Sequence, residues 1–213
     1  MLVAVVSDIH GNLPALEKAI SLCKKKFKVD KFICLGDVVG YGPWSNECVE
    51  IIKGLKNATK ILGNHEEYFL NRSCASKNPL TKLFFEHSIL DFKNFDEIKT
   101  YKKYFILDEI KFTHTIDKKY IFSDTDFKYS QNLVIGHSHQ QFKNINKNFW
   151  VINPGSLGQN RKNINKMDFA ILDTKTSNTK FVSEICDIQN LIREMKSRNY
   201  PEQCIKYYEG KII

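Results

Sequence analysis

Residues 2–12 read LVAVVSDIHGN, a short apolar run that ends in an aspartate, a spacer and a histidine. In an extended segment, side chains two positions apart point the same way, so Asp8 and His10 could converge on one cation. The same residues could instead form an ordinary turn in which the aspartate caps a helix. The residues that the rest of the chain brings to this turn distinguish the two interpretations.

Beyond this stretch, short runs rich in valine and isoleucine alternate with helical patterns, which is typical of an α/β sheet protein. Apolar residues recur at helical spacing over 13–23, with Asn12 as the N-cap and Pro14 in the first turn. Further strands are expected at 31–37, 59–67, 110–114, 132–139, 148–156, 169–174 and 180–185. Further helices are expected over 48–55, 79–92 and 96–104, after Asp187, and over 201–209.

Length and composition predict a single domain. A chain of 213 residues can form one substantial core, so one domain over 1–213 is expected, with a small helical, cap-like insertion around 68–108. Its start lacks the basic and apolar regions of a signal peptide, and no apolar run has the length of a membrane span, so a cytoplasmic location is expected. The six cysteines form no C-x-x-C pair and are predicted to be buried free thiols.

The net charge of +8 comes mainly from lysines dispersed along the chain, which has only four arginines. A solvated lysine-rich surface explains this charge better than a nucleic-acid partner does. The charge would still help to attract anionic substrates. The sequence gives no indication of the oligomeric state.

Candidate metal ligands recur where the predicted strands end. They are Asp8 and His10, Asp37, Asn64 with the adjacent His65, His114, and His137 with His139. In open α/β sheets, ligand sites gather at the carboxyl ends of strands, so these side chains are expected to share one edge. Oxygen and imidazole ligands without thiolate suit manganese, iron, zinc, cobalt or nickel. The set exceeds what one ion needs, and an aspartate bridging two ions is a recurrent arrangement in phosphoryl chemistry.

The motifs themselves carry a family resemblance. In order, D-x-H at 8–10, G-D at 36–37, G-N-H-E at 63–66, the lone His114 and G-H-S-H at 136–139 resemble the motif series of the calcineurin-like metallophosphoesterase superfamily. Within it, GDVVGYGPWSNECVEII and INPGSLGQNR look like the small YfcE-like or diadenosine-tetraphosphatase-like phosphoesterases. The resemblance spans residues 1 to about 175 and implies a four-layer α-β-β-α sandwich, with two mixed sheets face to face and helices outside.

The resemblance also implies roles for individual residues. One metal ion would be held by Asp8, His10, Asp37 and His139. The second would be held by Asp37, Asn64, His114 and His137. His65 matches the catalytic histidine, and a hydroxide between two divalent ions, with manganese as the first expectation, would be the nucleophile. Metal coordination would lower the pKa of that water and neutralise phosphate charge.

Several residues have two interpretations at this stage. Glu66 could orient His65 or serve a structural role, and the structural role is favoured. His87 lies on the apolar face of a predicted helix and is expected to be a packing residue. Possible phosphate contacts are Asn12, Asn153, Ser156 and Arg161, although Asn12 is also a helix cap and Asn-Pro-Gly is an ordinary turn sequence. Tyr41 and Trp44 could stack on a base but are more often packing residues.

These observations predict a dinuclear-metal phosphohydrolase that acts on a small phosphodiester or nucleotide. No arginine follows G-D in GDVVGYG, which disfavours a phosphoprotein substrate. The alternative is a weakly active scaffold on the same fold, but that alternative predicts lost site residues, and all eight are present. The physiological substrate and the native metal are not readable from the sequence.

Overall fold

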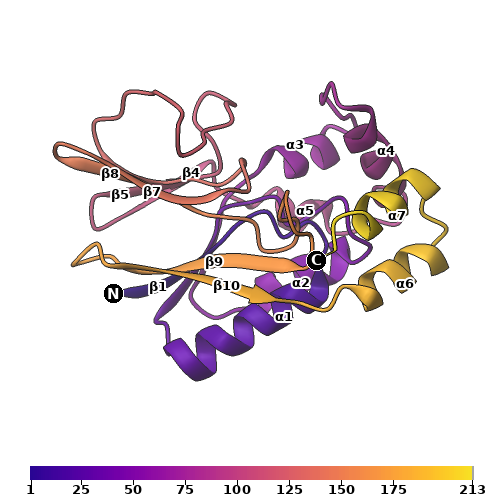
Figure 1. The fold of residues 1–213 in the computed structure, drawn as a ribbon, viewed down its shortest axis with the longest axis horizontal. Helices are drawn as coiled ribbons and strands as arrows, with labels where there is room; N and C mark the ends of the chain where they lie inside the picture. Colours follow the sequence, from indigo (N-terminus) through magenta and orange to yellow (C-terminus); the bar gives the residue numbers. More distant parts are fainter. Residues whose placement is uncertain (213) are drawn as a thin grey trace.

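The structure is a computed structural model and describes residues 1–212. In this range the strands form two five-stranded mixed sheets that pack face to face (Figure 1). The strand order is β10-β9-β1-β2-β3 in the first sheet and β4-β5-β6-β8-β7 in the second. The predicted pair of mixed sheets with helices around them is therefore confirmed.

The first sheet is built on three parallel strands, β1 (Leu2–Val6), β2 (Lys31–Cys34) and β3 (Ala58–Lys60). Two antiparallel strands, β9 (Lys166–Asp173) and β10 (Thr179–Ile185), extend it on the β1 side. Alternation along β1 sends Ala4 and Val6 toward the flanking helices, and Val3 and Val5 into the core between the sheets. Both faces of β1 are thus buried, which explains its uninterrupted apolar run.

The second sheet has a parallel centre as well. β5 (Ile110–Thr113), β6 (Asn132–Val134) and β8 (Phe149–Pro154) run parallel. The edge strands β4 (Tyr104–Leu107) and β7 (Gln141–Asn146) pair antiparallel with β5 and β8. The carboxyl ends of β5 and β6 therefore lie on the same side of the sheet.

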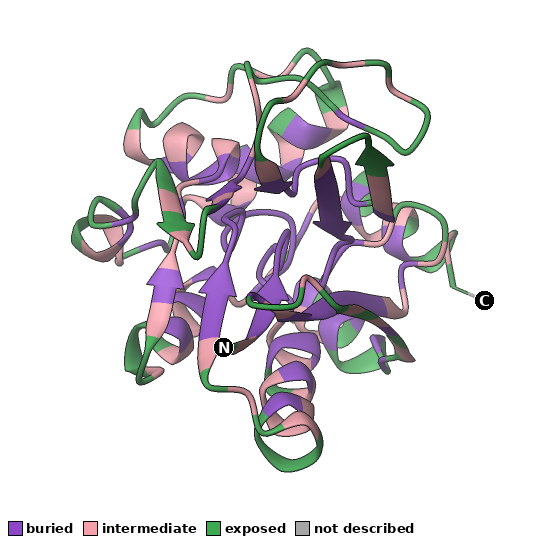
Figure 2. Ribbon diagram, turned by 90° about the vertical axis from the view of Figure 1, so that its left-hand side faces the viewer, coloured by how far each residue is buried: buried purple, intermediate pink, exposed green. Residues whose placement is uncertain are grey.

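The outer layers of the two sheets differ. Helices α1 (Leu13–Leu22) and α2 (Ser45–Gly54), with the π-helical turn η1 (Cys23–Phe27), cover the first sheet. The outer face of the second sheet is covered instead by the long connection between β5 and β6, whose Ile121 packs with Leu133 and Val151. Figure 2 shows the buried residues concentrated in the strands at the centre of the molecule.

The remaining helices lie at one end of the sheets (Figure 1). They are α3 (Asn64–Leu70), α4 (Pro79–Ser88), α5 (Phe95–Ile98), α6 (Gln189–Ser197) and α7 (Glu202–Glu209). A separate apolar cluster joins α4, α6 and α7 and includes Tyr41 and Phe84. The C-terminal helices therefore pack against the segment that follows Asp37.

Some predicted elements are wrong. The strand expected at 59–67 ends at Lys60, and Asn64–Leu70 is helical because the Glu66 carboxylate accepts the backbone N–H of Gly63 and two acidic residues begin the helix. The helix expected over 96–104 is confined to α5, and β4 follows it. β7 was not predicted, and the strands expected at 31–37 and 132–139 end at residues 34 and 134.

Other predictions are confirmed. Asn12 caps α1 by accepting the backbone N–H of Ala15, and Pro14 lies in the first turn. All six cysteines are free, and five of them are buried. Within residues 1–212, every helix is too short or too polar to serve as a membrane span.

Candidate metal centre

The predicted ligands come together at the carboxyl ends of strands from both sheets. Asp8 and His10 follow β1, Asp37 follows β2, and Asn64 and His65 begin α3 just beyond β3. His114 follows β5 directly, and His137 and His139 lie just beyond β6. The five histidines and two aspartates are buried. Asn64 is half-buried.

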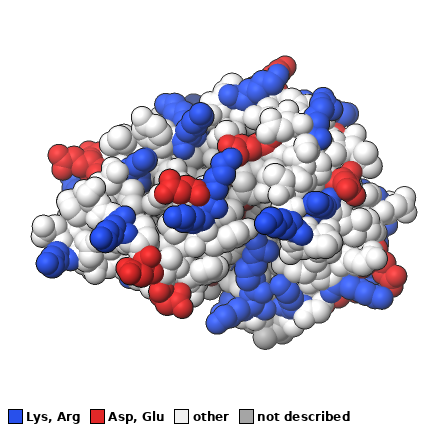
Figure 3. Space-filling model, turned by 90° about the horizontal axis from the view of Figure 1, so that it is seen from above, with Lys and Arg blue, Asp and Glu red and all other residues white. Residues whose placement is uncertain are grey.

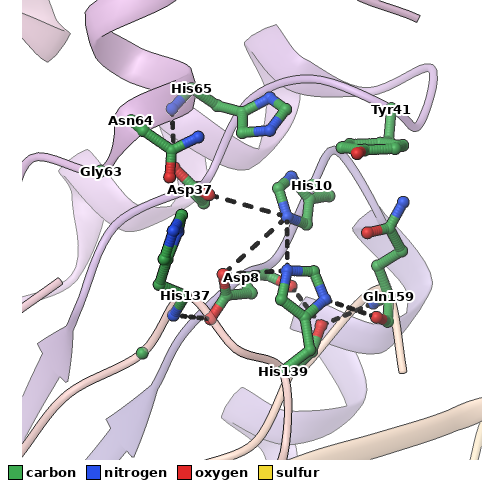
Figure 4. Close-up of polar contacts among 12 residues, drawn as sticks. Asp8, His10, Asp37, Tyr41, Gly63, Asn64, His65, His137, His139 and Gln159 are labelled. Atoms are coloured by element: carbon green, nitrogen blue, oxygen red, sulfur yellow. Dashed lines mark hydrogen bonds and ion pairs between the residues drawn. The ribbon is translucent and has the colours of Figure 1, made fainter. Parts of the chain in front are cut away.

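Asp8, His10 and His139 form what we call the first cluster (Figure 4). The Nε2 atom of His139 lies 3.2 Å from Asp8 Oδ1, and the Nε2 atoms of His10 and His139 lie 3.4 Å apart. Two imidazole nitrogens that face each other with their lone pairs repel unless a proton or a cation lies between them. Two nitrogens that share one tetrahedral ion at about 2.0–2.1 Å are separated by roughly 3.4 Å. The geometry of the first cluster therefore fits a bound cation.

His114, His137 and Asn64 form the second cluster, and Asp37 lies between the two clusters. The Asp37 Oδ2 atom is 3.3 Å from His114 Nε2 and 3.8 Å from His10 Nε2. Asn64 Oδ1 lies 3.1 Å from His114 Nε2. Asp37 is thus the carboxylate that both clusters reach.

Hydrogen bonds to the backbone fix three of the imidazole rings. The Nδ1 atoms of His10, His114 and His139 lie 3.2, 2.9 and 2.6 Å from the carbonyl oxygens of Val39, Leu35 and Gln159. A ring that donates its Nδ1–H to a carbonyl presents an unprotonated Nε2 to the opposite side, which is how proteins orient histidine ligands. All three Nε2 atoms point to the centre.

The backbone at the ligands is strained. Asp8, His10, Asp37, His137 and His139 have φ between 49° and 68°, in the left-handed region that residues other than glycine rarely adopt. Such conformations cost of order 1–3 kcal/mol each and persist only where the surroundings enforce them. Five of the candidate ligands therefore lie in loops whose conformation must be held by the surrounding structure.

Glu66 holds the Asp37 loop in place. Its carboxylate accepts the backbone N–H groups of Asp37, Val38, Val39 and Gly63 at 2.7–3.2 Å. A Cβ atom on Gly63 would lie 2.2 Å from Asp37 Oδ1, so only glycine allows this close approach. Glu66 therefore has the structural role that was favoured from the sequence.

His65 lies beside the clusters, and Gly40 covers the Nδ1 edge of its ring. Its backbone N–H donates to Asp37 Oδ1 at 2.8 Å. Its buried Nδ1 has no hydrogen-bond partner among the described residues and faces Gly40, where an added Cβ would lie 2.6 Å away. The Nε2 edge of the ring is therefore the edge that is free to meet a ligand.

Burial and charge shift the pKa values of the site. Burial lowers the pKa of His65 to about 4, and Asp37 only partly opposes this effect. Burial would also lower the pKa of His114, but the Asp37 carboxylate raises it to about 10. Burial and the neighbouring His114 lower the pKa of His137 to about 4. Without a bound ion, the second cluster thus keeps a proton on His114 that a cation would have to displace.

The four possible phosphate contacts divide into two groups. Asn12 donates to the Gly158 carbonyl, Asn153 donates to the Gly136 carbonyl, and Ser156 donates to the Asp8 carbonyl, at 2.8–3.1 Å. All three are buried, and their hydrogen bonds connect the loops that carry the candidate ligands. Arg161 instead lines the open pocket, and one of its terminal nitrogens lies 3.3 Å from His139 Nε2.

Other residues lie outside the site or were missed. His87 packs on Tyr200, its Nε2 lies 3.0 Å from the Arg198 carbonyl oxygen, and it is remote from the clusters, as expected. Tyr120 was not predicted, although its ring stacks on His137 with a centroid distance of 4.0 Å. It lies in the connection between β5 and β6, which carries no recognisable motif. Trp44 packs in the core, and Tyr41 lies within 4.7 Å of the His10 ring.

The clusters open into a pocket of about 360 Å³. Its lining includes four aromatic side chains and one threonine, namely Tyr41, Tyr68, Tyr120, Phe122 and Thr81. Tyr41 hydrogen-bonds Thr81 of α4 at 3.0 Å, so the segment around 68–108 contributes directly to the pocket wall. A cavity of this volume fits a small ligand.

The chain is similar to several known proteins. Residues 1–177 match the model of the calcineurin-like phosphoesterase superfamily domain. An uncharacterized protein of Methanocaldococcus jannaschii is 30% identical over 94% of both chains. A symmetrical bis(5'-nucleosyl)-tetraphosphatase of Psychromonas ingrahamii is 27% identical over 78% of this chain, which spans 63% of that enzyme's length. The crystal structure of a metallophosphoesterase from Sphaerobacter thermophilus superposes over 100% of this chain and 99% of its own, with a TM-score of 0.79 and 20% identity.

Proposed function

Because this chain belongs to the calcineurin-like phosphoesterase superfamily, we propose that it hydrolyses small phosphodiesters or nucleotides with the help of two divalent metal ions. Asp8, His10 and His139 would hold one ion, and His114, His137 and Asn64 the other. Asp37 would contact both ions. The observation that carries this proposal is the position of the Asp37 carboxylate between two groups of buried ligand atoms.

The donor atoms fit divalent ions. Asp8 Oδ1 is buried without a hydrogen bond among the described residues, and three imidazole rings present Nε2 to the centre. When bound, a pair of such ions supplies an acidified water and neutralises phosphate charge. The oxygen and imidazole set supports manganese, iron, zinc, nickel or cobalt. We take manganese as the first metal to test.

The residues around the ions would position and stabilise the substrate. A pKa of about 4 leaves His65 neutral at pH 7, so we assign it a hydrogen bond from Nε2–H to the phosphate or to the leaving oxygen. Arg161 would contact a phosphate oxygen from the rim of the pocket. Asn12, Asn153 and Ser156 would act by holding the ligand loops in their strained conformation.

We also propose a single domain with a cap-like insertion. We take residues 68–108 as a cap-like insertion in a single domain, because Tyr68, Ser76, Asn78 and Thr81 all line the pocket. The free cysteines suit a reducing compartment such as the cytoplasm. The substrate would be a small phosphoester or a nucleotide, given the size of the pocket.

The test is a direct assay with defined ions. Metal-free protein receives manganese and is assayed side by side on bis-p-nitrophenyl phosphate, p-nitrophenyl phosphate, cyclic nucleotides and diadenosine polyphosphates. We expect manganese-dependent hydrolysis and about two bound ions per chain by elemental analysis. Lys24→Gln, which changes an exposed side chain of η1, is the control. Inactivity on every substrate with both ions bound would refute the proposal.

A further inference from the structure

Arg161 carries a charge without an acidic partner beside the metal centre. It lies in the segment between β8 and β9, lines the pocket and is partly exposed there. Within residues 1–212 it forms no ion pair, whereas Arg198 lies within 3.4 Å of three carboxylates. A guanidinium stays charged in proteins. The charge of Arg161 is therefore available to an anion that enters the pocket.

Ion binding at the first cluster would leave this charge facing the pocket. One terminal nitrogen of Arg161 lies 3.3 Å from His139 Nε2. The proposed function assigns that Nε2 atom to a metal ion, and a nitrogen that binds an ion accepts no hydrogen bond. The N–H groups of Arg161 on this side would then donate to an oxygen of a bound phosphate.

Two tyrosines lie beside the Arg161 guanidinium. Burial would lower the pKa of Arg161, but Tyr41 and Tyr207 raise it above its ordinary value. The Tyr41 hydroxyl hydrogen-bonds Thr81 at 3.0 Å. The Tyr207 hydroxyl is buried and has no hydrogen bond of ordinary length and angle to another described residue. Since a buried hydroxyl without a partner is costly, the guanidinium is the donor available to it.

The C-terminal segment is attached to the backbone around Arg161. Lys211 Nζ donates to the Arg161 carbonyl at 3.1 Å and lies 4.1 Å from the centre of the Tyr207 ring. The Ile164 N–H donates to the Lys211 carbonyl at 3.0 Å. The Tyr207 ring also packs edge-on against Phe84 of α4, with the ring centroids 5.8 Å apart. These contacts fix the position of Tyr207 relative to Arg161.

Other basic side chains differ from Arg161 in their surroundings. Figure 3 shows lysines and arginines spread across the face seen from above, with acidic side chains between them. Such dispersed charge attracts anions in general but gives no defined binding position. The Arg161 side chain instead contacts the pocket, the first cluster and Tyr207.

From these contacts we propose that Tyr207 is a positioning residue for Arg161: its hydroxyl accepts a hydrogen bond from the guanidinium and directs that group toward a phosphate oxygen at the first cluster. A guanidinium has five N–H donors, so it can bind the hydroxyl and the phosphate together. The inference rests on the proposed function, since it takes Arg161 as a phosphate contact. Tyr207 lies beyond residue 177, where the family model ends, so this role is separate from the metal-ligand motifs.

The first experiment observes Arg161 in the metal-free protein, so that its outcome does not depend on catalysis. The chain has four arginines, whose Nε–Hε groups give separate signals in a nitrogen-15 NMR spectrum, and Arg161→Lys identifies one of them. Tyr207→Phe should shift the Arg161 signal and speed its hydrogen exchange by about tenfold, because a hydrogen bond to a charged group is lost. The other three signals should stay in place.

Tyr104→Phe is the matched control, because it removes the hydroxyl of an exposed tyrosine. It should leave all four signals unchanged. An unchanged Arg161 signal in Tyr207→Phe would overturn the inference. Equal movement of all four signals would also overturn it, since that result indicates a general change in structure.

The second experiment measures KM and kcat for bis-p-nitrophenyl phosphate with manganese present. Tyr207→Phe should raise KM by about 3- to 10-fold and change kcat by less than about twofold, because the phosphate oxygen is present before and during the reaction. In an Arg161→Ala background, Tyr207→Phe should have no further effect, since residues that act through one contact are not additive.

Two kinetic results would contradict the positioning role. They are an equal rise in KM in both backgrounds and an unchanged KM in Arg161→Ala. Either result would leave the proposed function standing. Failure of wild type on every substrate would refute the proposed function, while the NMR result would still decide whether Tyr207 binds Arg161.

Discussion

The two ligand clusters are built from similar side chains but in different surroundings. In the first cluster, Asp8 and His10 have no exposed surface, and both imidazole rings are fixed by backbone carbonyls. In the second, Asn64 is half-buried and His137 lies under an exposed tyrosine ring, and these two residues line both the pocket and a neighbouring groove of about 1080 Å³. The first cluster is therefore preorganised, whereas the second is accessible. We expect the first ion to bind tightly and the second to exchange more readily.

The strongest test of this comparison is removal of the shared carboxylate. Asp37→Asn should release ions from both clusters and lower kcat/KM by more than the 10²–10³-fold typical of a single electrostatic contact. Elemental analysis and turnover of bis-p-nitrophenyl phosphate measure the two effects. Retention of two ions with normal turnover would contradict the assignment of Asp37 to both clusters.

His65 belongs to neither cluster, so its removal should separate chemistry from ion binding. His65→Ala should lower kcat by about 10²–10⁴-fold and leave the ion content at the wild-type value. The readouts are kcat and elemental analysis, with the exposed substitution Lys24→Gln as the control. Loss of ions with little change in the remaining kcat would show that His65 is a ligand instead.

Tyr120 offers a way to weaken only the accessible cluster. Its ring stacks on His137, and partners that orient a ligand typically change metal affinity by 10–100-fold when they are removed. Tyr120→Ala should therefore weaken the second ion by about tenfold and leave the first unchanged, as measured by metal titration. Tyr104→Ala, an exposed tyrosine of the groove without a contact to His137, is the control. Equal weakening of both ions would remove the distinction between the clusters.

The smallest expected effect concerns the metal-free protein, in which His114 and His10 change the stability in opposite directions as the pH changes. Asp37 outweighs burial and raises the pKa of His114 to about 10, so His114 stabilises the fold fully below pH 6.5, and this contribution is lost as the pH rises toward 10. Burial lowers the pKa of His10, so His10 instead reduces stability as the pH falls below 6.5. Urea unfolding in EDTA at pH 7 and pH 9.5 should show a smaller decline for His114→Asn than for wild type. A steeper decline in the variant would refute the charge assignment.

Much of the site could be predicted because its signals are local in sequence. Each ligand follows a short apolar strand, and the carboxyl ends of parallel strands necessarily meet at one edge. The strained backbone at Asp8 and Asp37 could not be predicted, since it depends on Glu66 and on the loops packed around it. Tyr120 was missed for a related reason, because its role follows from where a long connection lies on the second sheet.

The errors in the fold have equally specific causes. Phe92, Phe95, Ile98 and Tyr101 recur every three residues and pack on one side, which resembles a helix, although only residues 95–98 are α-helical. β7 is an edge strand with the mostly polar sequence QFKNIN, so it lacks the apolar run of the central strands, and its pairing with β8 determines it. β4 has the apolar sequence YFIL, but its first residue falls within the helix that was expected over 96–104.

The C-terminal helices support the pocket, although they lie outside the part of the chain that the family model matches. The family model ends at residue 177, yet Tyr200 donates to the Gly42 carbonyl at 3.2 Å and Arg198 donates to that of Pro43 at 2.6 Å. These bonds buttress the loop that leads from Asp37 to α2, and Tyr208 packs behind Tyr41 in the same apolar cluster. Substitutions in this tail would therefore reshape the pocket without altering a single metal ligand. Divergence there is a route by which relatives with identical motifs could acquire different substrates.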